Sequence, residues 1–488
     1  MPSKVSLSPI VVWFREDLRL DDNPALAAAV QEGRPVIALY LLDSGPDAPR
    51  APGGASRWWL NLSLKALAGN LARIGVPLVL RRGPALRAVR AVLAEAGAAH
   101  IVWNRRYEAP GIAIDTELKA ALRGDGLLAE SFNGALLAEP WEVLTGAGQP
   151  YRVFAPFYRA MTARGAPAQP KDVKAPSSPL PEPPVLQSEE IDALLPLPAR
   201  PDWAGGLRDT WTPGEAGAHR RLEAFLDSRL HRYAGERDIP GADATSLLSP
   251  HLRFGEISPR RIWFATGTRA TAGEIADRHL DKFRSELGWR EFSYHLLFHF
   301  PAIGHASFQP RFEAFPWRDD PDGFLAWTRG RTGYPLVDAG MRELWHTGYM
   351  HNRVRMVAAS FLIKHLMIDW RQGEAWFWDT LVDADPANNT ASWQWVAGSG
   401  ADAAPYFRIF NPTSQGETFD PDGAYVRRWV PELARLPASY IHKPHAAPRE
   451  MLEHAGIRLG DTYPRPMVEH GAARQRALDA FQSIKNAA

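Results

Sequence analysis

The chain has 488 residues, of which 45% are hydrophobic and 23% charged, and these values predict at least two soluble domains. Its formal net charge at pH 7 is only +1, so nucleic acid would have to bind at a local basic face rather than through overall charge. The sequence contains no run of 18 apolar residues and no signal-like N-terminus, so neither membrane insertion nor export is expected, and a cytoplasmic enzyme is predicted. Cys is absent, which excludes disulfides, thiolate catalysis, zinc–thiolate sites and iron–sulfur clusters, so redox chemistry would need an organic cofactor or aromatic side chains.

Residues 1–135 alternate short apolar runs with helical segments. The helical stretch from Pro24 to Glu32 follows Asn23, a capping residue, and has proline at its first position. This alternation predicts a doubly wound, Rossmann-like α/β domain with a parallel sheet. No Gly-x-Gly-x-x-Gly follows the first strand, so a nicotinamide or ordinary Rossmann FAD site is not expected there. The predicted strands are Ile10–Phe14, Val36–Leu42, Pro77–Leu80 and His100–Trp103.

Residues 136–213 are predicted to link two domains. Ten prolines lie between Ala163 and Gly206, and this stretch has little periodicity, which is typical of an extended connector on the surface. From residue 214 to 488 helical signals dominate and no alternating strands occur. This half is therefore expected to be all-α.

Thr245, Ser246 and Ser249 place three hydroxyl groups within five residues, shortly before the helix start Ser258-Pro259. Hydroxyls and free N–H groups near helix starts form anion sites, so a pyrophosphate could bind here. Simple helix capping is the alternative interpretation.

Glu286, Trp289 and Arg290 lie on one face of a predicted helix, because they are three and four residues apart. Such a trio forms either an exposed, salt-bridged face or part of a binding site. A buried carboxyl group in such a site would be expected to stay protonated and to donate a proton or a hydrogen bond.

A third group combines one helix face with a polar segment further along the chain. Each buried polar group that lacks a partner costs roughly 1 to 3 kcal/mol, so a purely apolar core has no use for this group. It forms either a polar network between helices around a core methionine or a pocket for a polar ligand. Its members are Asn352, Arg355, Met356, Asp383, Asp385 and Asn389.

The segments Met350–Arg353, Asp383–Trp395 and Gly398–Arg408 resemble the flavin-binding core of the photolyase/cryptochrome family, and the likeness runs from the first strand to about Tyr463. The resemblance is to the bacterial class III cyclobutane photolyases in particular. It implies an N-terminal antenna domain and a C-terminal helical domain that binds FAD. The segments Ser56–Trp59, Trp103–Tyr107 and Tyr440–Pro444 support the match.

This resemblance implies a set of contacts to FAD in its reduced form, FADH⁻. The FAD phosphates would lie along the hydroxyl-rich strip, the Asp383–Arg355 pair beside the isoalloxazine ring, and Asp385 at the ring edge. Asn389 would face the reactive ring nitrogen, where a neutral amide does not repel an anionic flavin. The cofactor-binding residues so implied are Tyr233, Thr245, Ser246, Leu247, Leu248, Ser249, Trp289, Arg290, Asn352, Arg355, Asp383, Asp385 and Asn389.

The resemblance also implies a lesion pocket, in which Glu286 contacts the damaged pyrimidines and Trp289 and Trp395 form aromatic walls. Relatives that repair the (6-4) lesion carry histidines at the places of Asn352 and Met356, so a cyclobutane dimer is the better match. Arg237 and Arg408 are candidate contacts to DNA phosphates, with surface salt bridges as the alternative. Trp393, Trp370 and Trp317 match the family's electron relay, and Trp376 is a candidate for a branch.

The function implied is light-dependent repair of cyclobutane pyrimidine dimers in DNA by a lyase that acts on a flipped-out dimer. The enzyme is expected to be a monomer and to lie at the bacterial nucleoid when it is bound to DNA. A cryptochrome-type photoreceptor and a generic flavin oxidoreductase are the alternatives. The implied antenna is 5,10-methenyltetrahydrofolate in the crevice of the N-terminal domain. Pro110-Gly111 replaces the Asn-Glu pair of enterobacterial folate-binding relatives, so the folate would be held differently, and a deazaflavin is not excluded.

Overall fold

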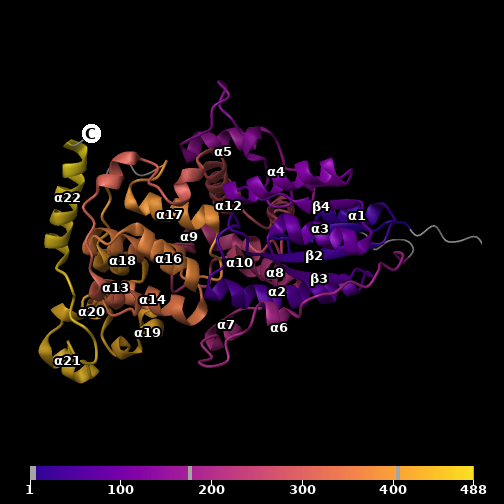
Figure 1. The fold of residues 1–488 in the computed structure, drawn as a ribbon. Helices are drawn as coiled ribbons and strands as arrows, with labels where there is room; N and C mark the ends of the chain where they lie inside the picture. Colours follow the sequence, from indigo (N-terminus) through magenta and orange to yellow (C-terminus); the bar gives the residue numbers. More distant parts are fainter. Residues whose placement is uncertain (1–6, 174–178, 403–406, 487–488) are drawn as a thin grey trace, which may run out of the picture.

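The computed structural model describes residues 7–173, 179–402 and 407–486. A sheet domain and a helical domain lie side by side, with the sheet domain on the right and the helical domain on the left in Figure 1.

The sheet domain contains five parallel strands in the order β3-β2-β1-β4-β5. Successive residues of β1 face opposite layers: Ile10 and Val12 pack with residues of α1 and α2, whereas Val11 and Trp13 pack with residues of α3 and α4. Helices therefore cover both faces, which confirms the doubly wound prediction. The elements are β1 (Ile10–Phe14), α1 (Pro24–Gln31), β2 (Val36–Asp43), α2 (Gly54–Ala72), β3 (Leu78–Gly83), α3 (Ala85–Ala96), β4 (His100–Asn104), α4 (Ala109–Gly124) and β5 (Leu128–Phe132).

The structure confirms the strands and the helix cap that the sequence predicts in this domain. The four predicted strands are all present, with ends that shift by up to three residues, and the Asn23 side chain caps α1 by accepting a hydrogen bond from the Leu26 N–H at 3.1 Å. The fifth strand, β5, was not predicted from the sequence. It is an edge strand on which Leu128 and Glu130 are exposed and the other residues are half-buried, so it lacks the continuous apolar pattern of a buried strand.

The segment between the two domains is partly helical. Phe157 and Met161 of α5 are buried in one cluster with Phe292 of the helical domain, and Leu194 and Leu207 are buried in the core of the sheet domain. The described residues from Gly165 to Glu190 contain no helix or strand. The helices of this segment are α5 (Phe154–Ala163), which lies at the top in Figure 1, α6 (Ile191–Leu194) and α7 (Gly205–Thr210).

The helical domain packs around a large apolar cluster that includes Trp327, Trp370 and Trp393. Beyond Gly214 the described residues form helices and turns without a β-strand, as expected, and no helix among the described residues is long and apolar enough to span a bilayer. Its helices are α8 (Glu215–Ser228), α9 (Tyr233–Glu236), α10 (Ser249–Arg253), α11 (Pro259–Thr271), α12 (Asp277–His299), α13 (Pro321–Thr328), α14 (Pro335–Thr347), α15 (Asn352–Ser360), α16 (Trp370–Thr380), α17 (Pro386–Ala397), α18 (Pro412–Phe419), α19 (Ala424–Trp429), α20 (Ala438–Ile441), α21 (Arg449–Ala455) and α22 (His470–Asn486).

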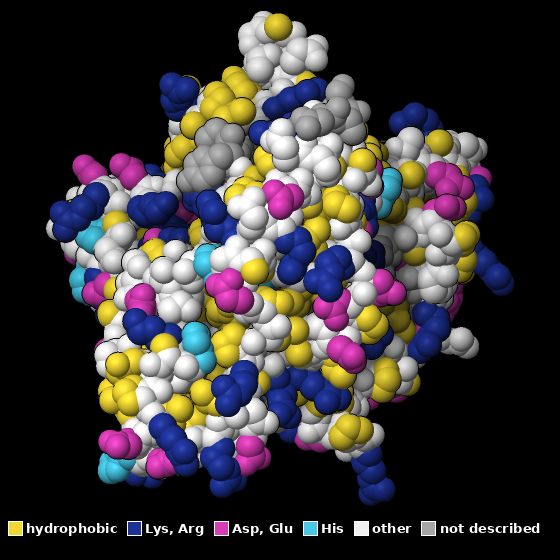
Figure 2. Space-filling view, turned by 90° about the vertical axis from the view of Figure 1, so that its left-hand side faces the viewer, with side chains coloured by type: hydrophobic (Ala, Val, Ile, Leu, Met, Phe, Trp, Pro, Cys, Tyr) yellow, Lys and Arg dark blue, Asp and Glu magenta, His cyan; other side chains and the backbone are white. Residues whose placement is uncertain are grey.

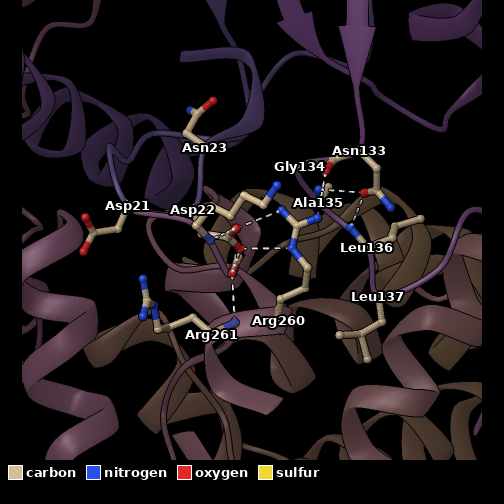
Figure 3. Close-up of polar contacts among 12 residues, drawn as sticks. Asp21, Asp22, Asn23, Asn133, Gly134, Ala135, Leu136, Leu137, Arg260 and Arg261 are labelled. Carbon is tan, nitrogen blue, oxygen red and sulfur yellow. Dashed lines mark hydrogen bonds and ion pairs between the residues drawn. The ribbon is translucent and has the colours of Figure 1, made fainter. Parts of the chain in front are cut away.

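A buried polar contact joins the domains at the start of α11. Arg260 donates to both carboxylate oxygens of Asp22, at 3.0 and 3.2 Å, and the Ser258 hydroxyl donates to the same carboxylate at 2.6 Å (Figure 3). Asp22 has a positive φ of 49°, an uncommon conformation for a residue with a side chain. Because Asp22 and Arg260 are both buried and hydrogen-bonded to each other, the domains are held in one arrangement.

Candidate active site

A cavity of about 560 Å³ lies in the helical domain, and residues of α12 and α17 line it. This volume is in the range of ligand and cofactor sites. Most of the site residues predicted from the sequence line it together, although they come from α9, α10, α12, α15, α17 and the turns before them. Those residues are Tyr233, Arg237, Ser246, Leu248, Ser249, Glu286, Trp289, Arg290, Asn352, Arg355, Met356, Asp383, Asp385, Asn389, Trp393 and Trp395.

Five predicted residues do not line this cavity: Thr245, Leu247, Trp317, Trp370 and Arg408. Thr245 and Leu247 are immediate neighbours of lining residues, Trp370 is buried in the apolar cluster, and Trp317 packs against that cluster and is only partly buried. Arg408 is exposed, and the preceding residues 403–406 of the Gly398–Arg408 motif lie outside the described residues.

Hydrogen bonds hold both carboxylates of the Asp383–Asn389 segment in place. Arg355 donates to both oxygens of Asp383, at 3.1 and 2.8 Å, and the Ser249 hydroxyl donates to Oδ2 at 2.7 Å. Asp385 caps α17 by accepting from the Ala387 and Asn388 N–H groups, and Pro386 occupies the first helical position. The sequence Asp385-Pro386 therefore starts the helix and places Asn389 one turn later on the cavity wall.

Tyr294 and Arg253 support the same segment, and sequence reasoning missed both. Tyr294 donates to Asp385 Oδ2 at 2.6 Å, and burial together with the Asp385 charge raises the pKa of Tyr294 well above its usual value, so it remains a donor. Arg253 Nε donates to the Ala384 carbonyl at 2.5 Å, and Arg253 Nη1 pairs with Glu16 of the sheet domain at 2.6 Å. No local pattern could reveal these contacts, because Glu16 and Arg253 belong to different domains.

The strip from Thr245 to Ser249 has a backbone suited to an anion. Leu247 has a left-handed φ of 53°, and Leu248 follows it in a right-handed conformation with φ −90° and ψ −6°. Consecutive residues of opposite hand turn their N–H groups to one side and form a concavity that binds phosphate oxygens. The strip fits the phosphates of FAD, whereas the Ser249 hydroxyl is directed to Asp383 instead.

Glu286 lies between two cations at the mouth of the cavity. Arg237 is hydrogen-bonded to its carboxylate, and Lys282 Nζ lies 3.2 Å from Oε1. Both contacts place a positive charge beside the carboxyl group, and the expectation that Glu286 donates a proton or a hydrogen bond stays a prediction.

Trp289 is stacked on Phe154 of α5. The ring centroids are 3.8 Å apart and the rings are nearly parallel, at 9°. Trp289 lines the cavity but Phe154 does not, so Phe154 covers the reverse face of the indole. The Phe154 N–H also donates to the lining residue Asp402 at 3.0 Å. Sequence reasoning missed Phe154 because it lies in the predicted connector.

Trp393 lies at the cavity wall and is buried, Trp370 is buried in the same cluster, and Trp317 is partly buried against that cluster. Gly373 permits the close approach of α16 to Trp393, since a Cβ there would lie 2.2 Å from the indole. Trp376 contacts a different indole, at the surface of the molecule. It stacks at 12° on Trp345, which is 61% exposed, with centroids 6.0 Å apart.

The crevice at the carboxyl ends of β1 and β4, where the strand order reverses, is filled by the chain's own side chains. Arg15 pairs with Asp115 at 2.6 Å, and the Asn104 amide donates to Asp17 at 2.6 Å. The remaining space is about 10 Å³, which is room for roughly one water molecule. Antenna binding in this crevice, where ligands of doubly wound domains usually bind, stays a prediction.

Comparisons with known proteins agree with this arrangement. Residues 10–182 match the profile of the DNA photolyase family, and residues 283–483 match the profile of the FAD binding domain of DNA photolyase. Over 481 residues the chain is 55% identical to a deoxyribodipyrimidine photo-lyase of Agrobacterium fabrum, with 98% of each chain covered. It is 39% identical to cryptochrome-1 of Arabidopsis thaliana over 97% of this chain and 70% of the relative.

The fold resembles the crystal structure of a bacterial class III photolyase from Agrobacterium tumefaciens, with a TM-score of 0.95, 54% identity, and coverage of 100% of this chain and 99% of that chain. The family profiles, the relatives and the shared fold thus cover both the sheet domain and the helical domain with its cavity. The chain belongs to the DNA photolyase and cryptochrome family, and its helical half is an FAD-binding domain of that family.

Proposed function

We propose that the protein is a deoxyribodipyrimidine photo-lyase that repairs cyclobutane pyrimidine dimers in UV-damaged DNA. One observation carries the proposal: residues expected to contact the lesion and residues expected to contact the flavin line the same cavity. The former include Trp289 and Met356, and the latter include Asp383 and Asn389. Bound FAD in its reduced form, FADH⁻, supplies the light-driven electron that splits the cyclobutane ring and then returns. The residues of the chain bind, orient and shield the two partners.

The flavin side of the cavity is polar and paired. Asp383 and Arg355 form a bidentate ion pair beside the ring, and Asp385 offers an acceptor at the ring edge, with Tyr294 holding it in place. The backbone concavity at Leu247 and Leu248 faces the phosphates. These groups fix the flavin at the wall of the cavity, so that the remaining volume is left for the lesion.

The lesion side of the cavity has the character that a neutral, stacked ligand requires. Trp289 and Trp395 offer aromatic walls, and Asn352 and Met356 offer an amide and a thioether where acid–base chemistry would call for imidazoles. Extrusion of the damaged nucleotides from the duplex into such a pocket costs a few kcal/mol, and less where the lesion already distorts the helix. Cyclobutane dimers are therefore favoured over (6-4) lesions.

Substitution Phe154→Ala is expected to weaken binding of dimer-containing oligonucleotide by roughly 2- to 10-fold, since an aromatic pair contributes about 0.5 to 1.5 kcal/mol beyond its buried area. The indole of Trp289 would lose the ring that fixes its plane. Dark binding titrations measure the effect, and the flavin spectrum should not change. Tyr158→Phe is the matched control, because it keeps the ring that stacks on Phe154 at 5.4 Å. Equal affinity of Phe154→Ala and the parent protein would contradict this role.

The strand that carries the lesion is proposed to be held by Arg237 at the cavity and Arg408 outside it. On the face that includes α22, Lys and Arg lie interspersed with Asp and Glu, so no broad basic field dominates this end of the molecule (Figure 2). Arg408→Glu is expected to lower affinity for dimer-containing DNA, and loss of one phosphate contact should reduce the salt slope of log K by about 0.9. Arg449→Glu makes the same charge change on α21 and should leave binding unaltered. If Arg408→Glu also leaves the affinity and slope unaltered, the phosphate contact does not exist.

Trp393, Trp370 and Trp317 are proposed to pass an electron from the surface to the flavin when it must be re-reduced. Indoles are easily oxidised, and short steps between neighbours replace one long step. Trp376 offers a second exit, through its stack with the exposed Trp345.

The antenna is proposed to be 5,10-methenyltetrahydrofolate, with a deazaflavin as the alternative, at the crevice of the sheet domain. The protein is proposed to act as a monomer in the cytoplasm, at the nucleoid when it is bound to DNA. A folate absorption band in the purified protein, absent after refolding with FAD alone, would identify the antenna.

Light-dependent repair tests the main proposal. Reduced protein is mixed with UV-irradiated oligothymidine, exposed to near-UV or blue light, and assayed for recovery of thymine absorbance, with a dark sample as the control. Recovery in light alone supports the lyase. Normal flavin binding without recovery would instead indicate a cryptochrome-type photoreceptor.

A further inference from the structure

Asn389 is a lining residue whose amide has a defined direction. Its Nδ2 donates to the carboxylate of Glu374 at 2.7 Å and to the Glu374 backbone carbonyl at 3.2 Å. Asn389 is 8% exposed and lines the cavity. Because both recorded contacts use the NH₂ group, the carbonyl oxygen Oδ1 is the part of the amide left for a ligand.

A carboxylate only accepts hydrogen bonds, whereas an amide can present either a donor or an acceptor. Glu374 therefore permits one orientation of Asn389: the NH₂ group towards Glu374 and the oxygen away from it. With a neutral amide at position 374 the side chain would accept either orientation, and only the backbone carbonyl of residue 374 would still favour the NH₂ group. The carboxylate of Glu374 therefore strengthens the preference for an oxygen that is directed away from it.

Glu374 is buried in the helical domain, and its counter-ion comes from the sheet domain. Arg50 Nη1 lies 2.8 and 2.9 Å from the two oxygens of Glu374, whose side chain is 7% exposed against 45% for Arg50. The Arg50 guanidinium also lies 4.4 Å from the centroid of the Trp378 ring, and the Trp378 indole donates to the Ala51 carbonyl. Arg50 therefore supplies the positive charge that a buried carboxylate requires, and it holds the Glu374 oxygens in the place where Asn389 contacts them.

We propose that Arg50 and Glu374 are positioning residues, through which the sheet domain sets the direction of the Asn389 amide at the flavin. The inference depends on the proposed placement of Asn389 beside the reactive ring nitrogen. An inward carbonyl accepts a hydrogen bond from that nitrogen when it carries a proton, as it does in reduced flavin. An inward NH₂ group would instead favour the unprotonated nitrogen of oxidised flavin. The ion pair between the domains thereby favours the reduced form that repair requires.

Glu374→Gln is the direct test, on full-length protein loaded with FAD. The flavin is reduced by light and an added reductant, and its absorption is followed during reoxidation in air. In Glu374→Gln the N5-protonated forms, which include a partly reduced form with a long-wavelength band, should decay about 3- to 10-fold faster, as expected for loss of one hydrogen bond. Arg50→Gln should act in the same direction but more weakly, because a half-exposed cation is screened. Arg50→Lys retains the charge and should restore most of the parent behaviour.

Asp379→Ala is the matched control, because Asp379 accepts from the Gly54 N–H at 2.8 Å in the same interface without touching Glu374. It should leave reoxidation unaltered. If Glu374→Gln does not fold, the comparison of Arg50→Gln with Arg50→Lys decides. Parent-like reoxidation in every folded Glu374 and Arg50 variant that retains FAD would overturn the inference, and so would an equal effect of Asp379→Ala. Failure of dimer repair in the parent protein would refute the proposed function without altering this spectroscopic result.

Discussion

Arg355→Ala is expected to abolish stable retention of FAD. Asp383 is buried, and Arg355 is its only cationic partner among the described residues, through the two hydrogen bonds at 3.1 and 2.8 Å. Removal of one member of a buried pair leaves an uncompensated charge at a cost of about 3 kcal/mol, which corresponds to roughly 100-fold in affinity. Burial opposes the charge on Arg355, but its acidic neighbours, Asp383 first, together outweigh burial and raise the pKa of Arg355, so the guanidinium keeps its charge at neutral pH.

The ratio of flavin to protein absorbance after purification, followed by titration of the apoprotein with FAD, measures this loss. Arg342→Ala is a suitable control. Arg342 has the same 25% side-chain exposure as Arg355 and pairs with Glu432 at 2.8 Å, but it does not line the cavity. The control should lose some stability and retain FAD. An unchanged FAD affinity in Arg355→Ala would show that the pair does not lie against the flavin.

Trp393→Phe is expected to eliminate photoreduction of the oxidised flavin while leaving dimer repair by chemically reduced protein intact. Trp393 is the relay candidate that lines the cavity, so an electron from Trp370 or Trp317 would have to bypass it. Phenylalanine fills most of the same space but is far harder to oxidise than indole. Flavin absorbance under blue light in the presence of an external reductant measures photoreduction, and thymine recovery measures repair.

Two further variants show whether the effect is specific to Trp393 and which path the electron takes. Trp211→Phe replaces a buried indole in the core of the sheet domain and should leave both rates unchanged. Trp370→Phe separates the two proposed exits. Loss of photoreduction places the electron path through Trp370, whereas partial retention indicates the path through Trp376 and the exposed Trp345. Photoreduction at the parent rate in Trp393→Phe would contradict the relay altogether.

Much of the site could be predicted from the sequence because its signals are local. Glu286, Trp289 and Arg290 share a face of α12 through their spacing alone, and they line one cavity as expected. Their spacing does not reveal which groups each of these side chains contacts. The sequence could not show that the carboxyl group of Glu286 meets Arg237, because Arg237 comes from a distant segment of the chain.

Local physical chemistry alone determines the parallel strands, the capped starts of α1, α11 and α17, and the faces of α12 and α15, because apolar periodicity and capping act within a few residues. Tertiary structure alone decided the edge strand β5, the stack of Phe154 on Trp289 and the closure of the sheet-domain crevice. It also decided the link from Arg50 through Glu374 to Asn389. The partners in these contacts are far apart along the chain. A hydrogen bond or a ring stack between such residues depends on how whole layers pack, and it leaves no periodic pattern in either segment.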